Sequence, residues 1–363
     1  MQTLRLVRTL AENDDRVTVC CYYEFDDEMV KRFESAGANL VLMKFERKDG
    51  LLRLAKGLYE IIKSRRPEIV HVQYITPGFV PVIAARLAGV KVIFASVHQP
   101  GRTYGWKAKF LLRSAVKLCT AFLCNSLSVE ESWFGESALY DPLNVDGNRR
   151  HWTIYNTVDA DQISQIVTET ERQTLRTSLG LGDRPVIGCV ARLREEKGQT
   201  VLLDAMVEVV KSVPEAILIM VGDGPDKEIL RKKSETMMID NHVKWMGQKS
   251  LEEVYLLYSI MNVVAVPSLF EGFGLSAAEA MAASLPVIAS NVDGLSEVIE
   301  DGMSGHLVAT GDSSAFATRI IELLRDPDKS MRFGRRGNLR VKKYYSYEKY
   351  NNQILSFYNS YST

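Results

Sequence analysis

The segment VIGCVARLREEKG, from Val186 to Gly198, decides the fold. Its first part, Val186 to Val190, is a short run rich in β-branched residues, and a charged loop follows it. The next stretch, Gln199 to Lys211, has the spacing of an amphipathic helix. A strand that leads through a short loop into a helix is the repeating unit of a parallel sheet. The segment therefore predicts one such unit of an α/β domain.

The same alternation recurs along the chain. Toward the C-terminus, strand-like runs lie at 217–221, 263–266 and 287–289, with helical stretches at 227–237 and 274–283. Toward the N-terminus, strand-like runs lie at 17–22, 69–73, 90–97, 121–125 and 152–155, with helical stretches at 51–64, 79–88 and 106–117. We therefore expect an α/β protein of two Rossmann-like, doubly wound parallel-sheet domains, in residues 1–160 and 161–343. A C-terminal helix is expected in residues 344–363, packing back on the N-terminal domain.

The chain begins in an unusual way for such a domain. Leu4, Val7 and Leu10 have helical spacing and precede the first strand-like run, whereas doubly wound domains normally open with a strand. We expect that a first strand and its glycine-rich loop are missing and that a longer chain would carry them. The alternative is a natural variant whose sheet edge has adapted.

The composition indicates an ordinary globular protein. The 363 residues are 46% hydrophobic and 25% charged, which suits two domains at roughly 150 residues each. No run reaches the ~18 apolar residues of a membrane span, and Arg5 and Arg8 interrupt any signal-like stretch. We expect a cytoplasmic location, either free or peripheral at the inner face of the membrane. The five cysteines form no Cys-x-x-Cys pair, and we interpret them as reduced core residues.

Charge is distributed unevenly along the chain. Residues 51–117 hold 12 Lys and Arg against 2 Asp and Glu, so a polyanionic partner would be met there. No zinc finger, basic zipper or RNA-binding signature is present, and nucleic acid is not expected as a partner.

Within this basic region, residues 106–117 suggest a helix that contacts a membrane surface. Helical spacing places Lys109, Arg113 and Lys117 on one face beside Trp106 and Phe110. Basic and aromatic side chains together suit a peripheral contact with a membrane surface. The alternative is a solvated basic helix whose aromatic residues pack against a neighbour.

The charged loop from Ala191 to Gly198 is the first candidate binding segment. It joins a strand to a helix at the carboxyl edge of the sheet, where Arg192 and Lys197 could neutralise a diphosphate. The alternative is that these are solvated loop charges.

A second candidate segment is Glu271-Gly272-Phe273-Gly274-Leu275, which leads into a helix carrying Glu279. Glycines let a ligand approach the backbone, and free amides at a helix start suit phosphate. The carboxylate of Glu279 could accept hydrogen bonds from sugar or ribose hydroxyls. The alternative is that Glu271 complements the helix dipole and Glu279 is solvated.

Other motifs carry weaker signals. The Gly222-Asp223-Gly224-Pro225 turn follows a strand but lacks the third glycine of a dinucleotide fingerprint, so it is a tight turn first and a ligand loop second. His98 closes a strand of the N-terminal domain and could face a substrate, although a lone histidine is often structural. Asp159-Ala160-Asp161 and Asp326-Pro327-Asp328 are interpreted as helix-capping acids, and no metal or other cofactor is expected.

Together these segments resemble the retaining glycosyltransferases of family 4, the group 1 family with the GT-B fold. The resemblance runs from about Arg5 to Tyr347 and is carried by the motifs in order. These are Arg192-Leu193 with Lys197-Gly198, Val221 to Pro225, Pro267-Ser268 before Glu271 to Gly274, Glu279 to Ala282, Pro286 to Ser290, Gly294 and Glu297.

The resemblance implies a role for each matched residue. Arg192 and Lys197 would hold the donor diphosphate, Glu279 the ribose, and Glu271 with the backbone from Gly272 through Phe273 and Gly274 to Leu275 the sugar and phosphates. The resemblance also implies that Gly222, Gly224 and Met246 are substrate-binding positions and that His98 contacts the sugar. It implies transfer with retention and without a metal. Ala191, Thr157, Ser284 and Asp293 stand where the family usually has glycine.

Three functions stay open. The first is a transferase in polysaccharide biosynthesis that moves a sugar from a UDP- or GDP-sugar to a saccharide or lipid-linked saccharide. The second is a non-catalytic sugar-nucleotide-binding scaffold, which the missing first loop suggests. The third is a sugar-nucleotide epimerase of the same fold. Turnover of a donor with and without acceptor separates the three.

Overall fold

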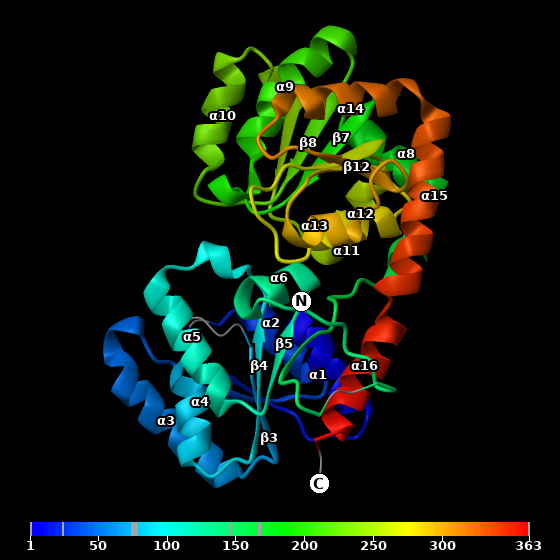
Figure 1. The fold of residues 1–363 in the computed structure, drawn as a ribbon. Coiled ribbons are helices and arrows are strands. Elements are labelled where there is room, and N and C mark those ends of the chain that lie inside the picture. The colour runs from blue at the N-terminus through cyan, green and yellow to red at the C-terminus, as the bar shows by residue number, and fades with distance from the viewer. Residues whose placement is uncertain (1, 24, 74–78, 145–146, 166–167, 362–363) are drawn as a thin grey trace. The chain divides into compact units, whose positions relative to one another are not determined.

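The computed structural model describes residues 2–23, 25–73, 79–144, 147–165 and 168–361 (Figure 1). The chain divides into two compact units. The N-terminal unit comprises residues 1–156 together with 348–363, and the C-terminal unit comprises residues 157–347.

The C-terminal unit is built on six parallel strands in the order β12-β11-β10-β7-β8-β9. Their bounds are β7 (Val186–Val190), β8 (Ile217–Val221), β9 (Val243–Gly247), β10 (Val263–Val266), β11 (Val287–Ser290) and β12 (Gly305–Val308). The strands β8 and β9 lie on one side of β7, and β10, β11 and β12 lie on its other side. This order is that of a doubly wound dinucleotide-binding domain.

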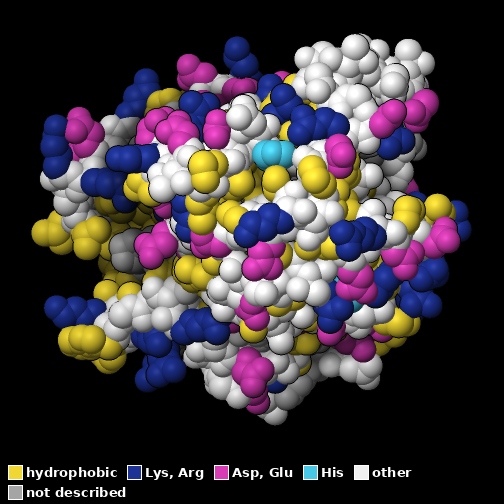
Figure 2. Space-filling model, turned by 90° about the horizontal axis from the view of Figure 1, so that it is seen from above, with side chains coloured by type: hydrophobic (Ala, Val, Ile, Leu, Met, Phe, Trp, Pro, Cys, Tyr) yellow, Lys and Arg dark blue, Asp and Glu magenta, His cyan; other side chains and the backbone are white. Residues whose placement is uncertain are grey.

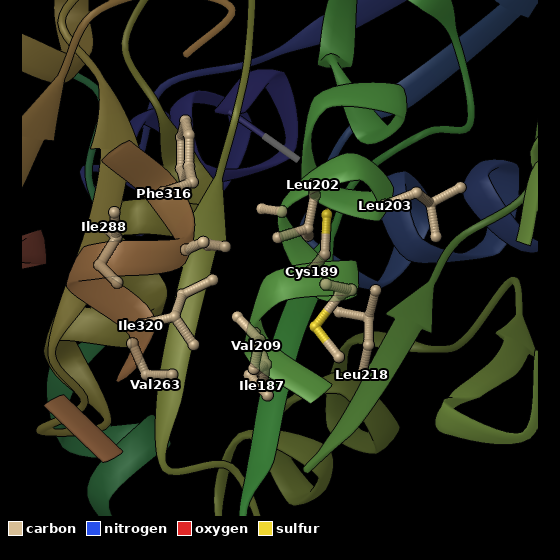
Figure 3. Close-up of a cluster of buried hydrophobic side chains, with 14 of the residues drawn as sticks. Ile187, Cys189, Leu202, Leu203, Val209, Leu218, Val263, Ile288, Phe316 and Ile320 are labelled. Carbon is tan, nitrogen blue, oxygen red and sulfur yellow. The ribbon is translucent and has the colours of Figure 1, made fainter. Parts of the chain in front are cut away.

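Nine helices surround this sheet within the described part of the unit. They are α7 (Ala160–Gln165), α8 (Glu169–Ser178), α9 (Gln199–Ser212), α10 (Lys227–Thr236), α11 (Leu251–Tyr258), α12 (Leu275–Ala282), α13 (Asp293–Val298), α14 (Ser313–Arg325) and α15 (Pro327–Tyr344). Figure 3 shows Leu202 and Val209 of α9 beside Cys189 and Ile187 of β7, and Phe316 and Ile320 of α14 on the side of Ile288 and Val263. Val264, which lies between Val263 and Ala265 in β10 and faces the other side, is buried as well, so the sheet is covered on both faces.

The N-terminal unit contains two parallel sheets among the described residues. The smaller pairs β1 (Thr18–Cys21) with β2 (Asn39–Leu42), and the larger has the order β3-β4-β5-β6. The bounds of the larger sheet are β3 (Ile69–Val72), β4 (Val92–Val97), β5 (Ala121–Cys124) and β6 (His151–Thr153). The helices are α1 (Gln2–Glu12), α2 (Asp27–Ser35), α3 (Gly50–Arg65), α4 (Phe79–Leu87), α5 (Trp106–Leu118), α6 (Leu127–Phe134) and α16 (Tyr347–Asn359).

Helices cover both faces of the larger N-terminal sheet. Ile93 faces a cluster formed with α4, α5 and α6, whereas its neighbour Phe94 faces α1 and α16. The rings of Phe94 and Phe357 have centroids 4.8 Å apart, which anchors the C-terminal helix on this unit. The expected helix at the start of the chain and the expected packing of the C-terminal helix are both confirmed.

Several predictions at the level of elements can now be compared with the structure. The two Rossmann-like parallel-sheet units are confirmed. The cysteines are free, as expected, although Cys20 and Cys21 are only half-buried. The strands β2, β9 and β12 were not among the predicted strands; β2 and β12 are only four residues long and β9 is five. Among the described helices, none is long and apolar enough to cross a membrane.

Candidate functional site

The order of the C-terminal sheet creates one special position between β7 and β10. From these adjacent strands the chain leaves in opposite directions, so the loops that follow them diverge at the carboxyl edge of the sheet. Doubly wound sheets bind ligands in the crevice at this switch point. The two strongest candidate segments of the sequence are the loops after β7 and β10.

A salt bridge joins these two loops. Nζ of Lys197 lies 2.7 Å from Oε2 of Glu271, and both side chains are largely buried, with 24% and 18% of their surface exposed. The hydroxyl of Ser268 lies 3.4 Å from the same oxygen. The backbone amide of Leu269 donates to the carbonyl oxygen of Glu196 at 2.9 Å, which holds the loops together at a second point. A cation and a carboxylate are thus fixed side by side at the switch point.

Gly198 allows this close approach of the loops. It has φ +65° and an added Cβ would lie 2.0 Å from the carbonyl oxygen of Pro267. Any side chain here would push the loop after β7 away from the loop after β10. Gly198 is also the N-cap of α9, so the backbone passes directly from Lys197 into the helix.

Arg192 is exposed in a loop that its buried neighbours hold in place. Leu193 is 1% exposed and anchors the loop in the core, whereas Arg192 is exposed. The buried side chain of Gln199 donates to the carbonyl oxygen of Arg192 at 2.8 Å and shapes the loop. Within the described part of the chain, the guanidinium of Arg192 forms no ion pair, so it is available to an anionic ligand.

The Gly222 to Pro225 turn supports the Arg192 loop from the next strand. The amide of Leu193 donates to the carbonyl oxygen of Asp223 at 3.0 Å. A Cβ on Gly222 would lie 2.0 Å from the carbonyl oxygen of Ala191, and one on Gly224 would lie 2.2 Å from that of Leu193. These glycines therefore have a packing role, consistent with a tight turn. Met246 is half-buried in β9, one residue before Gly247.

The second segment forms the start of α12. Gly274 has φ +95° and is the N-cap of the helix, and an added Cβ would lie 2.5 Å from Cδ2 of Leu295. Phe273 is 1% exposed and packs against the ring of Tyr345, with centroids 5.2 Å apart. Gly272 is buried and Leu275 is half-buried. This segment therefore offers a ligand its backbone, whereas the Phe273 side chain belongs to the core.

In the part of the C-terminal unit that the structure describes, capping side chains are present at some helices but absent at the two that begin at the switch point, as they are at α10 and α13. Thr168 and Ser250 cap α8 and α11 with side-chain hydrogen bonds and complete capping boxes. In contrast, α9 and α12 start at glycines, and no side chain of the described residues caps either helix. The amide of Val201 in α9 donates to the carbonyl oxygen of Gly198 at 2.9 Å, and the other first-turn amides of α9 and α12 are left for a ligand or water.

Glu279 lies on α12 and is half-buried. The hydroxyl of Tyr258, at the end of α11, lies 3.3 Å from Oε2 of Glu279 and 3.3 Å from the carbonyl oxygen of Ser276. Burial first, and then the nearby negative charge of Glu279, raise the pKa of Tyr258 well above its ordinary value. Tyr258 therefore stays a neutral donor that orients the carboxylate.

Tyr258 and Gln199 are positioning residues that were not predicted from the sequence, and Ser268 was named there only within a matched motif. Each of these side chains contacts a candidate residue that is not its neighbour in sequence. The sequence around each of them is typical of an ordinary helix or turn, so nothing in it indicated the contact. The alternative of a solvated loop charge does not describe Lys197, because its largely buried ammonium pairs with Glu271.

His98 belongs to the N-terminal unit, where it directly follows β4. Burial lowers its pKa to about 4, so the imidazole is neutral at pH 7. It lines a cavity of about 30 Å³ together with His71, Ser96 and Asn125. The side chain of Asn125 donates to the backbone carbonyl oxygen of His98 at 3.3 Å, which fixes the loop.

The first aspartate of each acidic pair acts as a helix cap, as expected. Asp159 accepts a hydrogen bond from the amide of Gln162 at 2.9 Å, and Asp326 accepts one from that of Lys329 at 2.8 Å. Among the residues that the structure describes, no group of three or more His, Cys, Asp or Glu side chains is placed to hold a metal ion.

Two departures from the family pattern keep a glycine-like backbone. Ser284 has φ +60° and Asp293 has φ +32°. Both positions therefore adopt the left-handed conformation that glycine takes without strain.

Comparisons with known proteins identify the family of the chain. The family described as "Glycosyltransferase Family 4" matches residues 1–162, and the family described as "Glycosyl transferases group 1" matches residues 171–340. The chain is 31% identical over 264 residues to the GDP-mannose-dependent alpha-(1-6)-phosphatidylinositol monomannoside mannosyltransferase of Mycolicibacterium smegmatis. That alignment covers 69% of this chain and 65% of the mannosyltransferase, so it spans slightly less than two thirds of that relative's length.

More distant relatives cover more of the chain. N-acetyl-alpha-D-glucosaminyl L-malate synthase of Bacillus anthracis is 25% identical over 85% of this chain and 78% of its own length. The crystal structure of Anabaena HepE in complex with UDP-glucose has a TM-score of 0.83 at 21% identity and covers 99% of this chain and 96% of that chain. Sucrose-phosphate synthase of Thermosynechococcus elongatus has a TM-score of 0.78 at 20% identity, covering 98% and 91%.

Proposed function

This chain belongs to the group 1 glycosyltransferases of family 4, and we propose that it transfers a sugar from a nucleotide sugar to a saccharide or lipid-linked saccharide with retention of configuration. Its fold is of the GT-B class. The observation that carries the proposal is the Lys197 and Glu271 pair at the switch point, between two helices that start without a capping side chain.

In this proposal the donor diphosphate lies against Arg192, Lys197 and the first amides of α9 and α12. Charge grows on the diphosphate as the bond to the sugar breaks, and fixed cations and amides stabilise that charge without reorganising. Glu271 holds the ammonium of Lys197 in place before the donor arrives. Glu271 also accepts hydrogen bonds from sugar hydroxyls, because a carboxylate is an acceptor only.

The remaining candidate residues serve recognition. Glu279, oriented by Tyr258, binds the ribose hydroxyls. His98 is proposed to contact the sugar as a neutral imidazole, since its lowered pKa keeps it uncharged at pH 7. Gly222, Gly224 and Met246 shape the site and do not bear charge. The reaction is proposed to need no metal, because Arg192 and Lys197 supply the positive charge that a divalent ion would otherwise provide.

The relatives suggest two kinds of donor. The name of the mycobacterial relative supports GDP-mannose and a lipid-linked saccharide acceptor. The complexes of HepE with UDP and UDP-glucose support a UDP-sugar. The nucleotide is therefore the first property to test.

The test begins with thermal shifts in a panel of UDP-, GDP- and ADP-sugars. A ligand at about 100 times its dissociation constant stabilises the folded state by about 2.7 kcal/mol, which is a clear shift. Wild type should respond to one base and the Lys197→Ala variant should respond far less. No response to any nucleotide sugar would contradict the proposal.

Turnover then separates the three functions. With the preferred donor and an acceptor extract, a transferase forms a new glycoside whose anomeric configuration can be determined by NMR. Binding without turnover would indicate a scaffold, and nucleotide release with an altered free sugar but no glycoside would indicate an epimerase. A chelator should leave donor binding and turnover unchanged, and restoration of lost activity by manganese would contradict the metal-free mechanism.

A further inference from the structure

The N-terminal unit exposes large apolar side chains where two of its helices begin. Leu51 and Leu52, in the first turn of α3, are 57% and 88% exposed. Trp106 and Phe110, in the first turns of α5, are 75% and 67% exposed. We call these four residues the apolar tip. They do not pack in the core of the unit, which disagrees with the alternative of aromatics buried against a neighbour.

The fold brings both parts of the apolar tip to the same edge of the unit. The helices α3 and α5 each lead into a strand of one parallel sheet, β3 and β5, so both helices begin at the carboxyl edge of that sheet. The helix α4 packs against both of them (Figure 1). The apolar tip is therefore one feature of the unit, although its two halves are more than 50 residues apart in sequence.

Exposed basic side chains lie on the two helices that carry the apolar tip. Lys56 on α3 and Lys107, Arg113 and Lys117 on α5 are exposed, and residues 51–117 as a whole hold 12 Lys and Arg against 2 Asp and Glu. Figure 2 shows hydrophobic side chains beside Lys and Arg at the left edge of the view, the side on which α3 and α5 lie in Figure 1. Nζ of Lys107 lies 5.6 Å from the centre of the Trp106 ring, so cation and aromatic are direct neighbours.

We propose that the apolar tip inserts into the surface of a bilayer that contains anionic lipid. Tryptophan and phenylalanine favour the boundary between headgroups and acyl chains, and the lysine and arginine side chains around them attract the negative headgroups. Charge complementarity selects this occupant, because a second copy of the chain would bring the same excess of positive charge against itself. The contact is peripheral, and the rest of the unit stays in water.

This membrane contact goes beyond the proposed transfer reaction and is tested without it. The edge that carries the apolar tip is also the edge at which His98 follows β4. A bilayer bound there would bring a lipid-linked acceptor to the same edge of the N-terminal unit, a consequence that rests on the proposed function.

Flotation of the protein with phosphatidylcholine vesicles, with and without added phosphatidylglycerol, tests the proposal. Wild type should bind the anionic vesicles at low salt, bind neutral vesicles weakly, and lose binding in high salt as the charges are screened. The Trp106→Ser, Phe110→Ser double variant should bind at least about tenfold more weakly, because two apolar groups no longer leave water. Its melting temperature should stay near wild type, since both side chains are exposed in the fold.

The helix α15 offers a matched control. It carries exposed Met331 and Leu339 among seven Lys and Arg residues, on a unit that the proposal does not involve. The Met331→Ser, Leu339→Ser variant should float like wild type. Trp106→Phe should also keep binding, but it should lose the blue shift of tryptophan fluorescence that insertion of Trp106 produces.

Three outcomes would overturn the proposal. The first is no binding of wild type to anionic vesicles, and the second is equal binding by the Trp106→Ser, Phe110→Ser variant. The third is sedimentation of wild type as a dimer that this double variant converts to a monomer, which would assign the apolar tip to self-association. Nucleotide-sugar binding, measured in the same preparations, reports independently on the proposed function.

Discussion

Lys197 and Glu271 lie 74 residues apart in sequence, yet their charged groups are 2.7 Å apart and connect the loops after β7 and β10. The pair is largely buried, and it lies where two helices begin without capping side chains. Its cation therefore has a partner before any ligand arrives, and its position is set in advance of binding.

Replacing Lys197 should affect turnover more than folding. Lys197→Ala removes a cation that stabilises charge growing on the diphosphate, and we expect a loss of about 2 to 4 kcal/mol in transition-state stabilisation. Arg192→Ala should act similarly and should change the melting temperature even less, because Arg192 is exposed. Lys227→Ala is the matched control, since its 3.0 Å ion pair with Asp223 is a comparable contact outside the switch point. Steady-state kinetics and thermal melts check this, and wild-type kcat/KM in Lys197→Ala would refute the assignment.

Glu279 and Tyr258 should act as a unit in nucleotide binding. Glu279→Gln should weaken binding of the free nucleotide, measured by calorimetry, because a neutral amide is a poorer acceptor for ribose hydroxyls than a carboxylate. Tyr258→Phe should weaken binding less, since it removes only the group that orients Glu279. A double variant no weaker than Glu279→Gln alone would show the coupling. Additive losses would instead mean that Tyr258 acts separately.

Gly198 should tolerate no side chain. Gly198→Ala places a Cβ 2.0 Å from the carbonyl oxygen of Pro267 and retains an unfavourable φ, so we expect a loss of at least about 2 kcal/mol in unfolding free energy. Gly180→Ala is the control, because Gly180 has a similar φ of +61° but no atom within 4 Å of an added Cβ. It should cost only about 1 kcal/mol. Urea unfolding measures both, and equal losses would show that the contact with Pro267 is unimportant.

Acid should destabilise the N-terminal unit through His71. This residue is half-buried, with Nδ1 2.6 Å from the hydroxyl of Tyr358 and Nε2 2.6 Å from that of Ser96. Burial, and then the nearby His98, lower the pKa of His71 from 6.5 to about 3. Below pH 6.5 the unfolded chain therefore binds a proton that the folded chain does not bind until about pH 3. The contribution of His71 to the free energy of unfolding is therefore complete above pH 6.5. Below that pH the free energy of unfolding falls by about 1.4 kcal/mol for each pH unit.

The measurement is urea unfolding at several values between neutral pH and pH 5. His71→Gln should reduce the dependence of the unfolding free energy on pH, whatever its effect at neutral pH. His242→Gln is the control, because Nδ1 of His242 lies 3.0 Å from a backbone carbonyl oxygen, that of Ala216, whereas both ring nitrogens of His71 contact side-chain hydroxyls. If His71→Gln keeps the full wild-type dependence, the acid sensitivity originates elsewhere.

Local patterns were sufficient to predict much of this protein. The alternation of β-branched runs with helical stretches, as at Val186 to Lys211, predicted two parallel α/β units, because period and composition act within single elements. The motifs around Arg192, Lys197, Glu271 and Glu279 were also recognisable, since each follows a strand or begins a helix. The helix at the start of the chain was visible for the same reason.

Contacts between distant segments were decided only by the tertiary structure. The pairing of Lys197 with Glu271 requires β7 and β10 to be neighbours, and that order depends on how the whole sheet packs. The support of Glu279 by Tyr258 and the core position of the Phe273 ring likewise depend on which helices meet. The apolar tip needs α3 and α5 to begin at one edge of the N-terminal unit. Periodicity shows which face of an element is apolar but not which partner covers it, because burial free energy depends on area and not on identity.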